Sequence, residues 1–361
     1  ATSTATAVNE AKTWHSVLVA PYRQGARGLI ALDVTNPYKP KVRWEITNQR
    51  RCWMTDDASE ATSCETFDED DRSDYRNLGF IHAKPQIGTV FIQDGLIRKE
   101  VAAAFFPCGE PVSGEPESGK CFMVVRLDNG EKIKEFRNGN TSVVDANTAT
   151  DNVIDTLDHA IVGDPVAYNT FLGTFVTRLF VGDAGGQLWR VDVSAPDPAD
   201  WKMGFFFDVY DDLADLPMFS AARSALRAAP AISPVPQRGQ LVLVFGTGDV
   251  DYAKTGQRTV VYSIKERLGF SATTGVTTGV VTHELNWRRE LKDGENLTSR
   301  PLIFGRTAYF TSFEPDKLDA CEGGLGRIWG LDFLDHTASN DPLGTLDKDG
   351  DVSTPAKVQY I

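Results

Sequence analysis

Five short apolar segments of the chain can be laid over one another, and most of them end in a Leu-Asp-like pair. In this alignment apolar side chains recur at every second position, as in a strand with one face in a core. The segments are Gly28–Asp33, Phe122–Asp128, Gln187–Asp192, Thr259–Lys265 and Arg327–Asp332. The predicted core face consists of Ile30 and Leu32, Val125 and Leu127, Trp189 and Val191, Tyr262 and Ile264, and Trp329 and Leu331. The repeat predicts a chain built from similar β units.

Each repeated segment has further strand signals around it. An apolar strand and a Gly-containing connection precede it, most clearly in Arg178–Trp189, where Gly185 and Gly186 supply the positive φ of a hairpin. Still further upstream, a proline marks the start of another short strand in four units, because proline is tolerated at the first position of a strand. These prolines are Pro85, Pro165, Pro230 and Pro301. A fourth strand follows the repeated segment, as in Val42–Ile46, Lys132–Phe136 and Met203–Phe207.

Four antiparallel strands per repeated unit are the blade of a β-propeller. The sequence therefore predicts an all-β fold, a modified β-propeller with five visible repeats, in one domain over residues 1–361. The units are longer than usual blades, so we expect insertions, the largest over residues 48–77. Residues 336–361 form a C-terminal segment with an acidic loop, and Asp211–Leu226 is the one plausible short helix. The alternative, two stacked β-sandwich domains, does not explain the common phase of the five units.

The cysteines indicate an oxidising compartment. Cys52 and Cys64 lie in one polar loop, and Cys108 and Cys121 lie in a loop rich in Pro, Gly, Ser and Glu. Neither pair has zinc-ligand spacing. Loops with so little apolar content cannot pack by themselves, and a disulfide stabilises such a loop by roughly 2–4 kcal/mol. We therefore predict the disulfides Cys52–Cys64 and Cys108–Cys121, with free thiols in a cytosolic protein as the alternative. Cys321 has no predicted partner.

Charge and motifs argue against several classes of function. The net charge of −13, from 50 acidic and 37 basic residues, disfavours nucleic acid and anionic lipid as partners. The chain has no run of 18 apolar residues, so we do not expect it to span a membrane.

Nucleophile-elbow, metalloprotease and nucleotide-binding motifs are missing from the sequence. The five histidines are scattered singly, and Trp189 and Trp329 occupy matched repeat positions typical of blade packing. We therefore predict no catalytic residue and no enzyme activity.

One weak metal signal lies near the end of the sequence. Asp347, Asp349 and Asp351 alternate around a glycine, as in calcium loops. The bidentate glutamate that such loops carry at their twelfth position is missing. The prediction is no cofactor, or one calcium ion held by these three carboxylates, with a solvated acidic loop as the alternative.

Four segments in order resemble PilY-type proteins, the adhesin and biogenesis factors of bacterial type IV pili. The first similar segment runs from Val17 to Thr35 and the second from Gly163 to Asp192. The third is Leu241–Gly248 and the fourth Cys321–Asp332. The resemblance covers most of residues 14–335 and implies the C-terminal propeller of that family, with about seven blades. The family's calcium loop would correspond to Tyr168–Thr177, which has no carboxylate, so we do not expect that site here.

The resemblance implies a non-enzymatic, extracellular interaction module at the pilus tip, reached after export through the periplasm. It would support pilus assembly and adhesion through minor pilins and other pilus-tip proteins, and contact host or abiotic surfaces. Two rivals share the propeller theme. A quinone-dependent dehydrogenase is disfavoured because no adjacent cysteines occur and the chain is short for that class. An outer-membrane assembly scaffold is expected to lack disulfide-bearing insertions.

Overall fold

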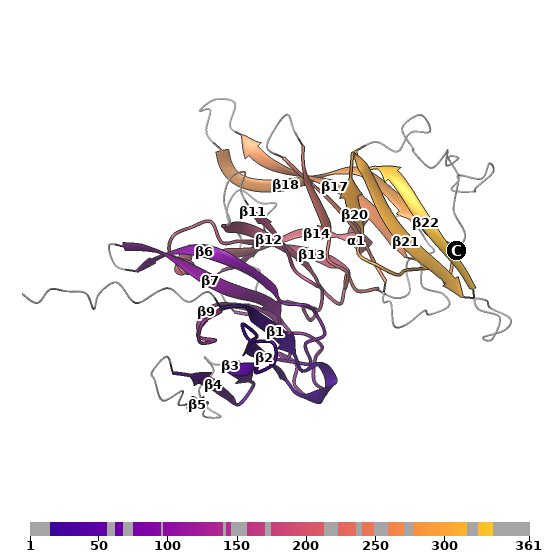
Figure 1. Cartoon of the computed structure of the whole chain (residues 1–361). Helices are drawn as coiled ribbons and strands as arrows, with labels where there is room; N and C mark the ends of the chain where they lie inside the picture. The colour runs from indigo at the N-terminus through magenta and orange to yellow at the C-terminus, as the bar shows by residue number, and fades with distance from the viewer. Residues whose placement is uncertain are drawn as a thin grey trace, which may run out of the picture.

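The structure, a computed structural model, is a succession of β-sheets that follow one another along the chain (Figure 1). The described residues are 15–55, 62–67, 75–94, 97–139, 142–145, 157–169, 175–212, 223–235, 240–248, 259–270, 277–315 and 324–334. These residues form five sheets of four or five strands each. Within them no helix has the length and apolar character needed to cross a membrane.

The first two sheets are antiparallel throughout. Sheet 1 has the order β1-β2-β3-β4-β5, and sheet 2 has the order β6-β7-β8-β9. The strands of sheet 1 are β1 (Val17–Pro21), β2 (Gly28–Asp33), β3 (Lys41–Thr47), β4 (Arg50–Met54) and β5 (Thr62–Thr66). Those of sheet 2 are β6 (Gln86–Asp94), β7 (Ile97–Pro107), β8 (Cys121–Arg126) and β9 (Lys132–Arg137).

The other three sheets repeat this plan with small additions. Sheet 3 contains β10 (Val143–Asp145), β11 (Val166–Asn169), β12 (Val176–Gly182), β13 (Gln187–Asp192) and β14 (Lys202–Asp208), with β10 parallel to β14. Sheet 4 contains β15 (Ala231–Pro234), β16 (Leu241–Gly246), β17 (Val260–Phe270) and β18 (Thr277–Glu290). Sheet 5 contains β19 (Asn296–Leu297), β20 (Leu302–Phe304), β21 (Thr307–Pro315) and β22 (Gly324–Asp332). Two 3-10 helices, Arg23–Gly25 and Pro198–Asp200, and one short α-helix, α1 (Val209–Asp212), occur among the described residues. Helix α1 overlaps only the start of the expected helix, most of which lies outside the described residues.

The repeat predicted from the sequence is confirmed strand by strand. The five repeated segments are β2, β8, β13, β17 and β22, and each pairs with the strand before it in the chain. The four prolines stand directly before β6, β11, β15 and β20, which are the Pro-led strands of sheets 2 to 5. The predicted fourth strands are β3, β9 and β14. Sheets made from such units are the all-β propeller-type architecture that we expected.

The aspartate that ends a repeated segment shapes the turn behind it. The Asp33 carboxylate accepts a hydrogen bond from the Thr35 amide at 2.9 Å, and Asp192 accepts from the Ser194 amide at 3.0 Å. Asp332 does the same with the Leu334 amide at 2.9 Å. Such side-chain-to-backbone bonds two residues ahead favour a turn over further strand. The Leu-Asp pair is therefore the point where a strand ends.

The core is divided into four layers, each lying between two successive sheets. One cluster joins sheets 1 and 2, a second joins sheets 2 and 3, a third joins sheets 3 and 4, and a fourth joins sheets 4 and 5. In sheets 2 to 5 the predicted core face turns toward the preceding sheet. Val125 lies in the first cluster, Trp189 in the second, Tyr262 in the third and Trp329 in the fourth.

The prediction of a core face is wrong for the first unit. Ile30 and Leu32 are only half-buried, and the buried side chains of β2 are Leu29 and Ala31. The physical reason is the order of the sheets. The face that carries Ile30 and Leu32 points away from sheet 2, and no described sheet precedes sheet 1 to cover it.

Candidate functional site

The loops at one end of the strands are tied together into a continuous rim. We define the rim as residues 22–27, 75–85, 108–120, 158–165, 183–186 and 223–230. Two antiparallel β-bridges lie within the rim, Phe80 with Glu110 and Ile161 with Asp183. A third bridge, which is parallel, joins Leu226 of the rim to Gly248 just outside it. In each bridge, one residue comes from the connection before the Pro-led strand, that is before β6, β11 or β15. The other residue comes from the loop that joins the next two strands of the same sheet, β7–β8, β12–β13 or β16–β17. The rim is therefore a backbone-linked platform in which the loops are held in fixed places.

Close backbone contact explains one glycine of the rim, Gly79, and one directly beside it, Gly182. A Cβ atom on Gly79 would lie 1.8 Å from the carbonyl oxygen of Glu110. One on Gly182, directly before the hairpin loop of sheet 3, would lie 2.2 Å from the carbonyl oxygen of Leu226. Any larger residue at either place forces the backbones apart.

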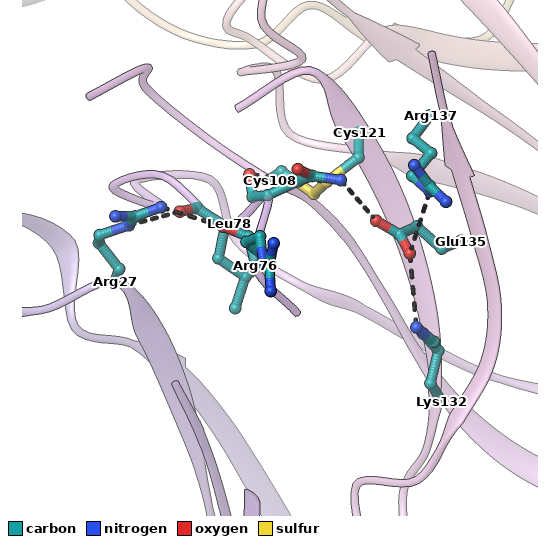
Figure 2. Close-up of a disulfide and its surroundings, with 9 residues drawn as sticks. Arg27, Arg76, Leu78, Cys108, Cys121, Lys132, Glu135 and Arg137 are labelled. Atoms are coloured by element: carbon teal, nitrogen blue, oxygen red, sulfur yellow. Dashed lines mark hydrogen bonds and ion pairs between the residues drawn. A yellow bond between two sulfur atoms is a disulfide. The ribbon is translucent and has the colours of Figure 1, made fainter. Parts of the chain in front are cut away.

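The disulfide Cys108–Cys121 lies at the base of the longest rim loop described (Figure 2). Both cysteines are fully buried, and the Cys108 amide donates to the Cys121 carbonyl at 2.9 Å. The enclosed loop bonds to its neighbours on both sides. The Gly119 amide donates to the Asn77 carbonyl at 2.8 Å, and the Ile161 amide donates to the Gly119 carbonyl at 3.0 Å. The disulfide thus fixes a loop that joins the entries to sheets 2 and 3.

Arg27 ties the first hairpin loop to the same region. Its guanidinium donates to the Leu78 carbonyl at 2.6 Å and to the Arg76 carbonyl at 3.0 Å (Figure 2). It also makes a two-pronged ion pair with Glu115, at 2.9 and 2.8 Å. Glu115 is half-exposed at 49% of its side chain, so this pair lies on the outside of the platform.

A second ionic group lies on the other side of the disulfide. Glu135 accepts from the Asn77 amide group at 3.1 Å and pairs with Lys132 and Arg137 at 3.4 and 3.7 Å (Figure 2). Residues from β9 and from the sheet 1–sheet 2 connection meet here. The region around Cys108–Cys121 is therefore held by covalent, ionic and backbone bonds together.

The second predicted disulfide is also present. Cys52 and Cys64 are directly opposite each other on β4 and β5 and are bonded. These strands belong to the predicted insertion over residues 48–77, and they extend sheet 1 by a hairpin. Cys64 is exposed and Cys52 is buried, unlike the fully buried pair at the rim.

Asp183 is the most strongly buried carboxylate of the rim. Its oxygens accept from the amides of Gly185 and Gln187, each at 2.8 Å, and from the Trp189 indole at 3.0 Å. Burial raises the pKa of Asp183 to about 6, and the three donors act against that rise. Every bond of this carboxylate holds the hairpin between β12 and β13. Its arrangement is that of a structural acceptor. The ring of His159 packs against Gly185 of the same hairpin, and burial lowers the pKa of this histidine.

The remaining predicted sites have clear outcomes. Trp189 and Trp329 are 2% and 6% exposed and pack between sheets, as predicted. The described histidines lie apart: His15 pairs with Asp33, His82 with Arg23 and Gln24, and His283 packs on two phenylalanines. No group of three metal-ligating side chains occurs within the described residues. Asp347, Asp349 and Asp351, like Cys321, lie outside them, so the calcium site stays a prediction.

One buried ionic group was missed by the sequence reasoning. Glu266, 1% exposed, pairs with Arg190 at 2.7 Å and with Arg178 at 2.5 Å, across the contact of sheets 3 and 4. A signal was present. Arg178 lies two positions before the core residue Phe180 on β12, and Arg190 two positions after the core residue Leu188 on β13, so both arginines are on a face that is otherwise apolar. A charge on a buried face requires a partner.

The chain is similar in sequence to a curated protein found in two strains of one bacterium. The type IV pilus biogenesis factor PilY1 of Pseudomonas aeruginosa, from strains PAO1 and PAK, is 23% identical to it over 249 residues, which is 65% of this chain. The chain spans only 17% of the length of that relative. No family model matches it.

The fold has a similar solved structure. The crystal structure of the PilY1 C-terminal domain of Pseudomonas aeruginosa superposes with a TM-score of 0.57 at 17% identity, over 96% of this chain and 74% of that one. The resemblance expected from the four sequence segments is therefore confirmed. This chain is similar to PilY1 in sequence, and it has the fold of the PilY1 C-terminal domain.

Proposed function

We propose that this chain is a non-enzymatic, extracellular interaction module of a type IV pilus-associated protein. The observation that carries the proposal is the sequence similarity to PilY1 over 65% of the chain, together with the shared fold. Two disulfides support an oxidising location such as the cell exterior. In the finer form of the proposal, the module acts at the pilus tip and binds minor pilins and surfaces through its loops.

The rim is the surface that fits this role best. Interaction residues of scaffold proteins are commonly carried on loops that a rigid framework positions. The loop 108–120 is fixed by a buried disulfide, yet it exposes Glu115 and Glu117. We therefore assign partner contacts to this loop and its neighbours in the rim.

Shearing of pili tests the location. The full-length protein that carries this chain should appear in the sheared pilus fraction of a piliated strain and be lost from that of a strain without pili. Chemical crosslinking before shearing should join it to a minor pilin. Equal amounts in both fractions would refute the pilus association.

Charge reversal tests the rim. The variant E115K/E117K should lose most of the crosslink to the minor pilin while retaining its fold by circular dichroism. The control D128K/E131K makes the same change in the turn between β8 and β9, at the opposite end of the strands, and should crosslink as the unchanged protein does. An equal loss in both variants would point to general charge effects. Appearance of quinone absorbance after incubation with the cofactor would instead favour the dehydrogenase class.

A further inference from the structure

The residues directly before the four strand-leading prolines lie at the rim end of the strands. They are Lys84 before β6, Asp164 before β11, Ala229 before β15 and Arg300 before β20, and we call them the pre-proline group. Each of these Pro-led strands contacts the next, β6 with β11, β11 with β15 and β15 with β20. The four strands therefore lie side by side across sheets 2 to 5, and the pre-proline group lies where they begin.

Residues from three sheets act on one carboxylate, that of Asp164. The Lys84 amide donates to this carboxylate at 2.8 Å, and the Lys84 ammonium lies 4.0 Å from it. Burial raises the pKa of Asp164, and the Lys84 amide and the charges of Lys84 and Arg300 act against that rise. Arg300 has this influence although sheet 4 stands between its own sheet and sheet 3. The starts of the Pro-led strands are thus close enough together for their side chains to form one group.

The pre-proline group exposes more positive than negative charge. The Lys84 side chain is 90% exposed and Arg300 is exposed, whereas the Asp164 side chain is only 25% exposed. One oxygen of Asp164 already accepts the Lys84 amide. Ala229 carries no charge and is buried. Two solvent-facing cations therefore share one partly buried carboxylate, so that positive charge is in excess.

This arrangement favours an anionic ligand over a cation or an amine, which the two cations repel. Lysine and arginine both make charge-assisted hydrogen bonds to carboxylates. The net charge of −13 disfavours large polyanions such as nucleic acid at long range. At physiological salt, charges beyond about 8 Å are largely screened, so a short acidic segment in contact with the group responds mainly to the local cations. Because Lys84 and Arg300 come from different sheets, a segment with several carboxylates can contact both.

We propose that Lys84 and Arg300 form a binding site for a short acidic segment of a protein partner. The inference rests on the proposed role of the rim, to which Lys84 and Asp164 belong, and it adds the chemistry of the partner. Carboxylates of the partner pair with the two cations, and the charge of Asp164 limits the affinity because it repels them.

Binding of an acidic peptide tests the site. The probe is a fluorescent peptide of six glutamates, with a peptide of six glutamines as the neutral control, and fluorescence anisotropy measures binding to the purified full-length protein that carries this chain. The variant K84E/R300E should weaken binding of the glutamate peptide about tenfold or more, because each cation becomes a repelling charge. The control K39E/K41E makes the same change of charge at two exposed lysines beside the turn between β2 and β3, at the opposite end of the strands. It should bind as the unchanged protein does.

The variant D164N should have an effect of the opposite sign. Its side-chain carbonyl can still accept the Lys84 amide, but the charge that repels the ligand is lost. Binding of the glutamate peptide should therefore tighten by about threefold. Weaker binding by a D164N variant that is folded by circular dichroism would show that the carboxylate itself serves the ligand, and would overturn the proposal.

The remaining outcomes are distinct. The proposal is wrong if the unchanged protein does not bind the glutamate peptide, or if K84E/R300E and K39E/K41E lose binding equally. Displacement of the peptide by inorganic phosphate, but not by chloride at equal ionic strength, would reassign the site to a small anion and also overturn it. These measurements use purified protein, so their failure differs from absence of the protein in sheared pili, which would refute the proposed function instead.

Discussion

At the scale of single residues, stability depends on a few buried charges with complete sets of partners. Asp183 is the clearest case, because its carboxylate is fully buried and accepts three hydrogen bonds. Burial disfavours the charged form more than the donors favour it, so the pKa rises from 3.8 to about 6.

The raised pKa of Asp183 predicts a pH effect with a definite sign. Between pH 4 and 6 the folded protein binds this proton and the unfolded chain does not, so the group's contribution to stability falls as the pH rises. The shift corresponds to about 3 kcal/mol. The free energy of unfolding of the unchanged protein, minus that of D183N, should therefore increase by up to that amount on going from pH 6.5 to pH 4. Denaturant titrations at each pH measure it, and a difference independent of pH would contradict the prediction.

Glu266 predicts a large loss of stability. The variant E266Q leaves Arg178 and Arg190 buried without their shared counter-charge, which should cost about 3–5 kcal/mol in the free energy of unfolding. The control E65Q breaks the pair Arg51–Glu65, in which Glu65 is 47% exposed. Its loss should be below about 1 kcal/mol. Equal losses in urea titrations of the two variants would show that burial is not the deciding factor.

At the scale of elements, covalent and ionic links decide which loops are rigid. The rim loop 108–120 is closed by a disulfide inside the core, whereas β4 and β5 are joined by one with an exposed cysteine. The pairing of all four cysteines was predictable because each pair encloses a polar loop too poor in apolar side chains to pack. The rim itself was not predictable, since its bridges join residues far apart in sequence, such as Phe80 and Glu110.

The two disulfides should differ in their resistance to reductant. Dithiothreitol applied to the native protein should open Cys52–Cys64 first, because a thiolate must reach a sulfur atom and Cys64 is exposed. Cys108–Cys121 should open only with unfolding. Timed maleimide labelling followed by peptide mass spectrometry measures both. Simultaneous labelling of the four cysteines would contradict the difference in burial.

The acidic loop near the C-terminus carries one further prediction. If Asp347, Asp349 and Asp351 ligate calcium, calorimetric titration should detect a single site, and D349A should abolish it because one of three carboxylate ligands is lost. The matched control D341A removes a nearby carboxylate outside the alternating pattern. Tight binding that persists in D349A would place calcium elsewhere.

At the scale of the whole molecule, burial follows the order of the sheets. The alternating pattern correctly predicted which faces of β13, β17 and β22 are apolar, and the same pattern failed for Ile30 and Leu32. The side chains themselves are of the same kind in all these strands. Sequence periodicity identifies an apolar face, but a neighbouring sheet must be present to bury it.

The same reasoning predicts opposite outcomes for two aromatic residues. Trp189 is buried between sheets 2 and 3, so W189A should lower the free energy of unfolding by about 3–5 kcal/mol. Phe304 is 75% exposed on sheet 5, the last described sheet in the series. The variant F304A should therefore change the free energy of unfolding by no more than about 0.5 kcal/mol. Removing this exposed ring should also reduce association at high concentration, because solvent-exposed apolar patches promote it. Urea titration and light scattering of both variants measure the two effects. A large destabilisation by F304A would mean that a further part of the protein covers the outer face of sheet 5 in solution.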